Sequence, residues 1–209
     1  MCGIVGYVGE RAALPIILES LKRIEYRGYD SCGVLVLEED GEPKLHKDAG
    51  TIDNLKERLS AFDYTGTIAI GHTRWATHGG PTRNNAHPHL DGKGEIAVVH
   101  NGIIENFQAI KEMLLSQGCT FLSDTDTEVI PHLIQTFMST ASKQRSGTFE
   151  WQLKEAVRET LSRLKGSYAI IAAVKGFDGL IAARKESPLI IGVGDRENFI
   201  ASDVPAVLV

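Results

Sequence analysis

A cysteine stands second in the chain, directly after the initiator methionine, in the stretch MCGIVGYVGE. Removal of the methionine would give Cys2 both a thiol, with a pKa of about 8.5, and a free α-amine, with a pKa of about 7.7–8.0. One residue could then supply a nucleophile and its own proton acceptor. The alternative is a buried strand cysteine, because free cysteine is among the most buried residue types. Position alone favours this alternative.

Attack of a thiol on an acyl carbon needs hydrogen-bond donors for the oxygen that becomes negative. In VVHNGIIENF, Asn101 and Gly102 come at the end of a predicted strand. A side-chain amide and an unhindered backbone N–H could there point at one oxygen. The alternative is a plain β-turn, of which Asn-Gly is typical.

Binding of an α-amino acid would need a guanidinium for its carboxylate and a carboxylate for its ammonium group. The stretch HTRWATHGG offers Arg74, with Thr77 and His78 as hydrogen-bonding neighbours in a loop. The stretch SDTDTEV offers Asp124 and Asp126. A surface arginine and a helix-capping aspartate are the ordinary alternatives for these residues.

A cluster of histidines raises a different chemistry, that of a metal hydrolase. HPHLD has the spacing H-x-H-x-D, which can place two imidazoles and a carboxylate on one metal ion. The related dinuclear signature needs a further histidine where Gly92 stands. We therefore expect no metal and no other cofactor, and histidines that orient loops by hydrogen bonds. The histidines concerned are His72, His78, His87, His89 and His100.

Composition excludes several classes of protein. The 209 residues carry a formal charge of −5 without a basic cluster, so we expect no nucleic-acid partner. No apolar stretch approaches the roughly 20 residues of a membrane span, so we expect no membrane association. Three widely spaced cysteines favour a reduced, cytoplasmic setting over a disulfide framework. The chain ends on the apolar run VPAVLV, which suggests a fragment of a longer protein.

The hydrophobic pattern alternates between strand and helix periods and predicts stacked antiparallel sheets covered by helices, an α+β fold. Tight turns, such as Asp40-Gly41, favour antiparallel pairing. A capping box is predicted at Thr125 and Glu128. The expected strands are 3–9, two around residue 40, 67–75, 95–102, 167–174, 179–184, 188–194 and 198–202, and the expected helices are 13–24, 54–62, 107–118, one from 129 and one over 149–164.

Six motifs, in order, resemble the class II glutamine amidotransferases of the N-terminal nucleophile hydrolase superfamily. They are MCGIVGYVG, EYRGYDS, HTRWATHG, NAHPH, HNGIIENF and SDTDTEV. The sugar-phosphate enzymes of the class, the glucosamine-6-phosphate synthases, are the most similar, and their glutaminase domain would cover residues 2–209. The resemblance implies a four-layer αββα sandwich of two stacked antiparallel sheets.

The resemblance also implies roles for single residues. Cys2 matches the family's nucleophile, and its α-amine the general base. Asn101 and Gly102 match the oxyanion hole. The positions matching glutamine contacts are Arg74 for the carboxylate, Asp126 for the ammonium group, and Thr77 and His78 in a closing loop. Trp75 matches a residue implicated in ammonia passage, and Arg27 and Gly28 lie near the nucleophile.

The implied partners are L-glutamine and a sugar isomerase domain that this chain does not contain, with a homodimer expected for the full-length enzyme. By itself the chain would then form glutamate and ammonia. Other class II enzymes, such as amidophosphoribosyltransferase, asparagine synthetase and glutamate synthase, remain alternatives. A regulatory glutamine-binding module without turnover is a further alternative.

Overall fold

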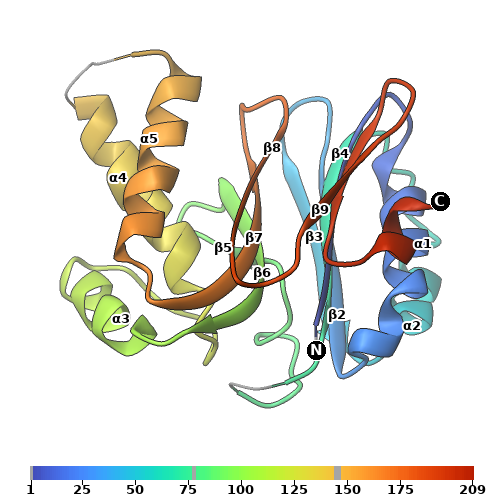
Figure 1. Cartoon of the computed structure of the whole chain (residues 1–209), viewed down its shortest axis with the longest axis horizontal. Helices are drawn as coiled ribbons and strands as arrows, with labels where there is room; N and C mark the ends of the chain where they lie inside the picture. Colours follow the sequence, from blue (N-terminus) through green and yellow to red (C-terminus); the bar gives the residue numbers. More distant parts are fainter. Residues whose placement is uncertain (1, 77–78, 144–146) are drawn as a thin grey trace.

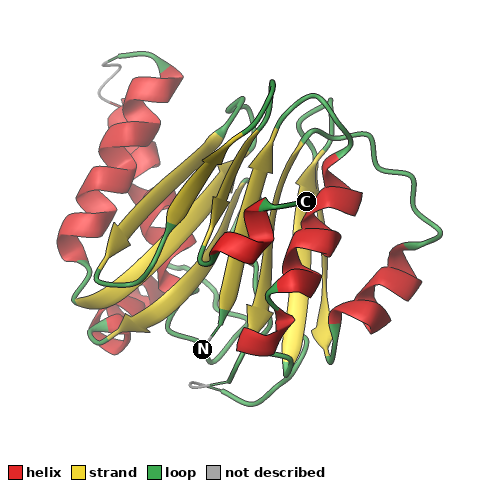
Figure 2. Ribbon diagram, turned by 45° about the vertical axis from the view of Figure 1, so that its right-hand side comes forward, coloured by secondary structure: helices red, strands yellow, loops and turns green. Residues whose placement is uncertain are grey.

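Four layers stack in the computed structural model, which describes residues 2–76, 79–143 and 147–209. A layer of helices, a sheet, a second sheet and another layer of helices follow one another across the molecule (Figures 1 and 2). The predicted α+β class and αββα order are therefore confirmed.

The first sheet contains the strand that follows Cys2. Its strands pair antiparallel in the order β3-β2-β4-β1-β10-β9. The strand after Cys2 is central in this order, so both of its edges are hydrogen-bonded to neighbours. The strands are β1 (Gly3–Val8), β2 (Ser31–Leu37), β3 (Pro43–Ala49), β4 (Ile68–Arg74), β9 (Ile190–Val193) and β10 (Asn198–Ala201).

The second sheet carries Asn101 and Gly102. Its order is β5-β6-β7-β8, again antiparallel throughout. Strands β4 and β1 of the first sheet pack against β6 and β7 of the second. The central strands of the two sheets therefore face one another. The strands are β5 (His89–Leu90), β6 (Ile96–Ile104), β7 (Gly166–Val174) and β8 (Leu180–Lys185).

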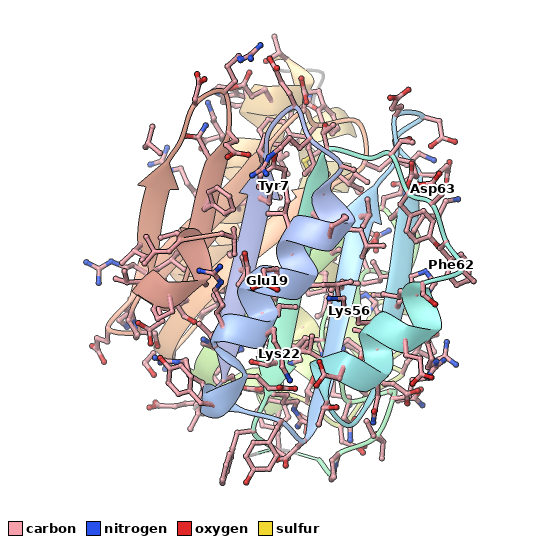
Figure 3. All side chains as sticks on the ribbon, turned by 90° about the vertical axis from the view of Figure 1, so that its right-hand side faces the viewer. Tyr7, Glu19, Lys22, Lys56, Phe62 and Asp63 are labelled. Carbon is pink, nitrogen blue, oxygen red and sulfur yellow. The ribbon has the colours of Figure 1, made fainter. Side chains whose placement is uncertain are left out.

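Helices cover the outer face of each sheet. Figure 3 shows α1 (Ala13–Arg23) and α2 (Ile52–Leu59) across the first sheet, with Lys22 and Lys56 on them. Over the second sheet lie α3 (Phe107–Ser116), α4 (Val129–Lys143) and α5 (Phe149–Arg163) (Figure 1). Two short 3₁₀ turns, η1 (Glu25–Arg27) and η2 (Val204–Val207), complete the described elements. No helix in the described ranges is long and apolar enough to cross a membrane.

Apolar side chains fill the three spaces between the four layers. One cluster packs α1 and α2 against the first sheet, a second packs α3, α4 and α5 against the other sheet, and a third lies between the sheets. Ile4 and Ile171 belong to the third cluster and are fully buried. Burial of apolar surface in each space, at about 25 cal/mol per Å², holds the layers together.

Most predicted elements are confirmed, with boundaries displaced by a few residues. Strand β6 is the informative difference, because it continues through Asn101 and Gly102 to Ile104 instead of ending there. The turn alternative for Asn-Gly is therefore wrong. The short strand β5 inside the long polar segment is not foreseen from the sequence.

The predicted capping box is also wrong. The Glu128 carboxylate accepts hydrogen bonds from the backbone N–H groups of Leu122 and Ser123, at 2.8 and 2.7 Å, rather than from Thr125. The Thr125 hydroxyl is instead paired with Ser123 and His89. Glu128 thus fixes the loop before α4, which carries Asp126.

Candidate active site

Cys2 lies where β1 begins, beside the end of β4. Pairing of Gly3 with Thr73 brings Arg74 and Trp75 next to the cysteine. The backbone N–H of Trp75 donates to the Cys2 sulfur at 3.2 Å, and the sulfur lies 3.5 Å from the Trp75 carbonyl oxygen. The thiol is therefore held by the backbone of the motif HTRWATHG, 73 residues further along the chain.

The surroundings of the thiol act on its pKa in both directions. Burial raises the pKa of Cys2, while the hydrogen bond from Trp75 and the positive charge of Arg74 oppose that rise. Asp126 adds a smaller contribution that raises the pKa. With the net direction upward, the thiol stays protonated at neutral pH, so attack by its sulfur needs a base to take the proton.

Two side chains donate hydrogen bonds to the backbone carbonyl oxygen of Cys2. Asn101 reaches across from the second sheet and donates from Nδ2 at 3.0 Å. Arg27, in η1, donates from Nε to the same oxygen at 3.2 Å. An amide nitrogen has two hydrogens, so one N–H of Asn101 is left for another acceptor. The carbonyl of the cysteine is thereby bonded to the second sheet through Asn101 and to η1 through Arg27.

Gly102 occupies a backbone conformation that other residues avoid. Its φ is +126°, and an added Cβ would lie 2.1 Å from the carbonyl oxygen of Ser167 on β7. Only glycine allows β6 to continue past Asn101 in this way. Asn101, which bonds Cys2, is thus followed by a position on β6 that requires glycine.

Arg74 is 4% exposed, although it lies at the end of a strand. Its guanidinium donates to the carbonyl oxygens of Gly80 and Gly79, at 3.1 and 3.2 Å. Burial lowers the pKa of Arg74, and the charges of Cys2, Asp126 and Asp30 partly compensate. Guanidinium remains charged at any pH the protein meets. The site therefore contains a buried cation whose charge acts on the Cys2 thiol.

Asp126 provides the matching negative charge. It is 6% exposed, and its Oδ2 accepts a hydrogen bond from the backbone N–H of Ile104 at 2.7 Å. Its charge acts on both Cys2 and Arg74. The site thus holds a buried cation and a buried anion near one thiol, as an α-amino acid would require.

The loop of η1 approaches the end of β4 too closely for a side chain at Gly28. A Cβ there would lie 2.7 to 2.9 Å from backbone atoms of Arg74 and Trp75. Trp75 is 46% exposed, and its ring contacts that of Tyr29 edge-on at 5.6 Å. Gly28 and Trp75 therefore belong to the same assembly as the cysteine.

Asp30 supports the site from the same loop, and no role was predicted for it from the sequence. Asp30 accepts a hydrogen bond from Ala76 N–H at 2.9 Å, and its own N–H donates to the Arg74 carbonyl at 3.0 Å. It holds the backbone on both sides of Trp75. The motif YRGYDS contains Asp30, and this was the sequence signal that could have indicated a role for it. Thr77 and His78, predicted to contact the substrate, lie outside the described residues.

Four buried histidines, His72, His87, His89 and His100, are linked by hydrogen bonds and ring contacts, and His100 directly precedes Asn101 in the sequence. His72 Nε2 pairs with the carbonyl oxygen of His100 at 3.1 Å, and the N–H of His100 donates to His87 Nδ1 at 3.3 Å. The rings of His72 and His87 stack at 4.0 Å, and His89 packs edge-on against His87. The backbone N–H and C=O of His100, the residue before Asn101, are thus both held by imidazole rings.

These contacts give the histidines a role in hydrogen bonding. His89 Nε2 pairs with the Thr125 hydroxyl at 3.1 Å, and His100 Nδ1 with the Thr127 hydroxyl at 2.9 Å. Within the described ranges, no group of three histidine, cysteine, aspartate or glutamate side chains could hold a metal ion. His78, a member of the predicted cluster, lies outside those ranges.

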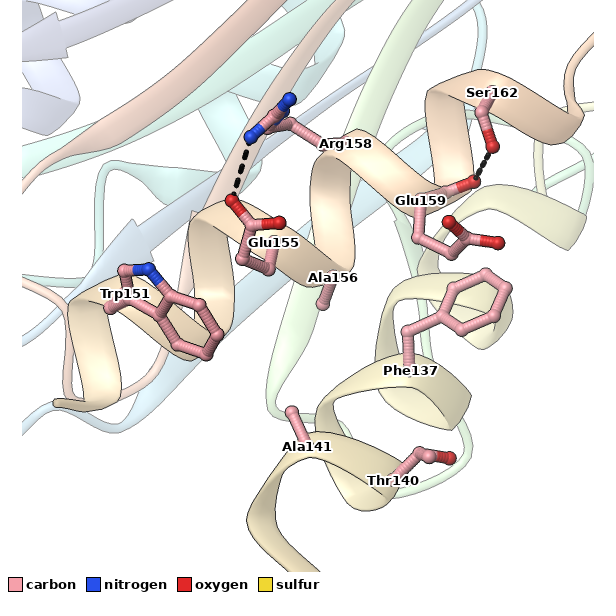
Figure 4. A pocket seen from close by; sticks show the side chains of 9 residues that line it. All are labelled: Phe137, Thr140, Ala141, Trp151, Glu155, Ala156, Arg158, Glu159 and Ser162. Carbon is pink, nitrogen blue, oxygen red and sulfur yellow. Dashed lines mark hydrogen bonds and ion pairs between the residues drawn. The ribbon is translucent and has the colours of Figure 1, made fainter. Parts of the chain in front are cut away.

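A groove also lies between α4 and α5 on the outer helical layer (Figure 4). Its volume is about 550 Å³. Arg158 pairs with Glu155 at its wall, and Ser162 donates to the Glu159 carbonyl. These helices cover the far side of the second sheet, so the groove takes no part in the site around Cys2.

Comparison with known proteins gives a consistent family. The model of a glutamine amidotransferase domain matches residues 72–209. The glutamine–fructose-6-phosphate aminotransferases (isomerizing) of Clostridium tetani and Pyrococcus horikoshii are 50% and 53% identical over the whole chain. The chain spans about a third of their length, 32% and 33% respectively.

Solved structures agree with this result. Glutamine phosphoribosylpyrophosphate amidotransferase from Bacillus subtilis superposes with a TM-score of 0.79 at 31% identity, covering 98% of this chain and 42% of that one. A class II glutamine aminotransferase domain protein from Silicibacter pomeroyi gives a TM-score of 0.54 at 18% identity, over 96% of this chain and 88% of that chain, which speaks for the fold alone.

The buried histidines predict how stability depends on pH. Burial lowers the pKa of His72 to about 3 and lowers the pKa values of His87, His89 and His100. Unfolding returns them to about 6.5, so the unfolded chain binds more protons below that pH. The free energy of unfolding should be highest above pH 7 and should fall as the pH drops. His72 alone should lower it by about 2 kcal/mol at pH 5.

Urea unfolding at pH 7.5, 6.5 and 5.0 measures this dependence. Histidine side-chain NMR at pH 5.5 provides the control, because the buried rings should still show shifts of neutral imidazole. Equal stability at pH 7.5 and 5.0, or protonated buried rings at pH 5.5, would contradict the assignment.

Proposed function

Because the chain belongs to the glutamine amidotransferase domain family, we propose that it releases ammonia from the side-chain amide of L-glutamine, with the Cys2 thiol as nucleophile. One observation carries the proposal. Cys2 stands at the start of a central strand, where the charge of buried Arg74 acts on its thiol. The backbone carbonyl of Cys2 accepts a hydrogen bond from Asn101. The residues proposed as nucleophile, oxyanion donor and carboxylate partner, Cys2, Asn101 and Arg74, thus come from three distant parts of the sequence.

The proposed reaction has two stages. After removal of the methionine, the α-amine of Cys2 takes the thiol proton as the sulfur attacks the amide carbon. The tetrahedral intermediate collapses, the carbon–nitrogen bond breaks, and the same amine returns the proton to the leaving nitrogen to give ammonia. Water then attacks the thioester carbon, giving glutamate and the free thiol.

The second N–H of Asn101 and the backbone N–H of Gly102 would stabilise the oxygen that becomes negative in both stages. Arg74 would pair with the substrate carboxylate and Asp126 with its ammonium group, with Thr77 and His78 as further contacts. Trp75 would border the route that ammonia leaves by. No metal or other cofactor is needed for these steps.

For the whole protein, the relatives' names suggest the use of the ammonia. We propose that residues 2–209 form the glutaminase domain of a longer enzyme and that a sugar isomerase domain converts fructose 6-phosphate to glucosamine 6-phosphate with it. A cytoplasmic setting is supported by three cysteines that form no disulfide, Cys2, Cys32 and Cys119.

The dual role of Cys2 predicts that nothing can precede it in the active protein. Retention of the methionine, or an uncleavable N-terminal tag, turns a basic amine into a non-basic amide while leaving the thiol in place. Glutamate release should be nearly lost and should return when cleavage leaves Cys2 first. Rates of preparations verified by mass, with folding matched by circular dichroism, measure this effect.

Cys32→Ala and Cys119→Ala provide matched controls, because the side chains of both cysteines pack in the apolar clusters beneath the helices and should leave turnover nearly unchanged. Equal rates for the extended and trimmed proteins would remove the assigned role of the amine. Substantial turnover by Cys2→Ala would remove the assigned role of the thiol.

Binding and chemistry should separate between Arg74 and Asn101. Arg74→Ala removes a partner of substrate and transition state alike, so KM should rise strongly with a smaller change in kcat. Asn101→Ala should lower kcat by about 10²–10³-fold, because its bond strengthens as the oxygen becomes anionic. Steady-state kinetics measure both, with Arg158→Ala as an exposed arginine control. An unchanged kcat in Asn101→Ala would refute the oxyanion role.

A further inference from the structure

The last described strand ends beside the nucleophile. Strand β10 runs antiparallel to β1, with Ala201 opposite Val5, so the residues after β10 lie at the start of β1. The N–H of Ser202 donates to the carbonyl of Ile4 at 3.0 Å, and the N–H of Ile4 donates to the Ser202 hydroxyl at 3.1 Å. The corner after β10 is thus joined to the chain two residues from Cys2.

Asp203, the next residue at this corner, holds Arg27. Its Oδ2 accepts hydrogen bonds from Arg27 Nη1 at 2.7 Å and from the Tyr26 hydroxyl at 2.6 Å. Its Oδ1 accepts from the N–H of Val204 at 2.8 Å, so both oxygens are used. The same guanidinium donates from Nε to the Cys2 carbonyl. A carboxylate 201 positions away is therefore connected to the nucleophile through one side chain.

This ion pair is better shielded than the others on the surface. The side chain of Arg27 is 11% exposed and that of Asp203 is 28% exposed. The hydrogen bond from Tyr26 is the largest of the causes that lower the pKa of Asp203, so the carboxylate stays charged at neutral pH. Charged hydrogen bonds of this kind are short and directional.

We propose that Asp203 is a positioning residue that orients Arg27 on the Cys2 carbonyl and so fixes the thiol for attack. The inference rests on the proposed role of Cys2 as nucleophile. An arginine side chain has several rotatable bonds, and its free rotation would have to be restricted each time the carbonyl is bound. Asp203 restricts it in advance. A displacement of a reacting group by about 1 Å can cost 10²-fold in rate.

A matched control exists at the opposite end of the same two strands. Glu197, directly before β10, accepts hydrogen bonds from Tyr7 at 2.9 Å and from Arg11 at 2.9 and 3.0 Å. Tyr7 lies near the end of β1 remote from Cys2 (Figure 3). Glu197 thus accepts hydrogen bonds from a tyrosine and an arginine, as Asp203 does, but at the end of β1 that is remote from Cys2.

The first experiment compares Asp203→Asn with Glu197→Gln in the trimmed protein. The asparagine side chain has no negative charge and only one oxygen, which can accept at most two of the three bonds, so its hold on Arg27 is weakened. For Asp203→Asn, kcat for glutamate release should fall by at least about 10-fold with KM within about 3-fold. Glu197→Gln should keep kcat within about 2-fold. An unchanged kcat in Asp203→Asn, or equal losses in both variants, would overturn the proposal.

The second experiment tests whether Asp203 acts through Arg27. Arg27→Lys keeps the charge but cannot bridge the carbonyl and the carboxylate with a planar fork. If the two residues act as one unit, the double variant should be no more than about 2-fold slower than the slower single variant. Losses that multiply would overturn the proposal. Should Asp203→Asn fail to fold, Tyr26→Phe removes one bond to the carboxylate and should show a smaller fall in kcat with unchanged KM; an unchanged kcat there would overturn it.

A readout independent of activity separates this inference from the proposed function. Amide hydrogen exchange of the peptide that begins at Cys2 should be faster in Asp203→Asn than in Glu197→Gln, since the start of β1 is freed. If the unaltered protein forms no glutamate, the proposed function fails, while faster exchange still supports the contact and equal exchange overturns it.

Discussion

The site around Cys2 depends on how the backbone of that residue is held where β1 begins. Once the methionine is removed, Cys2 would be a free end, and chain ends are normally the least ordered part of a domain. Two hydrogen bonds to its carbonyl, from Asn101 of one sheet and Arg27 beside the other, remove that freedom. Because Asn101 lies on β6 of the second sheet and Cys2 directly precedes β1 of the first, the packing of the two sheets also sets the geometry at Cys2.

The charged groups near Cys2 are also buried and balanced. A buried guanidinium and a buried carboxylate, Arg74 and Asp126, lie near the thiol and compensate one another. Behind them the imidazoles stay neutral because burial disfavours their charged form, and they serve as hydrogen-bonding groups. Neutral imidazoles thus hold the backbone of His100, the residue before Asn101, without adding a further charge to the site.

The sequence predicted the layers and most strands, because period-two apolar runs and tight turns are local signals. The ordered motifs brought Cys2, Arg74 and Asn101 together. In the structure Asn101 bonds the Cys2 carbonyl, and Arg74 directly precedes Trp75, whose N–H bonds the Cys2 sulfur. The sequence missed what depends on distant partners. The bonds of Glu128 to Leu122 and Ser123, the continuation of β6 past Gly102, and the approach of Asp203 to Arg27 follow from tertiary packing that no local pattern encodes.

The central claim, that the thiol of Cys2 attacks the side chain of bound glutamine, is most directly tested by covalent trapping. The trimmed protein would be treated with a glutamine analogue whose side-chain amide is replaced by an electrophile, and the adduct mapped by mass spectrometry. We expect one adduct per chain, on Cys2, with labelling slowed by excess glutamine. Labelling of Cys32 or Cys119 instead, or labelling of Cys2 that glutamine does not slow, would contradict the account.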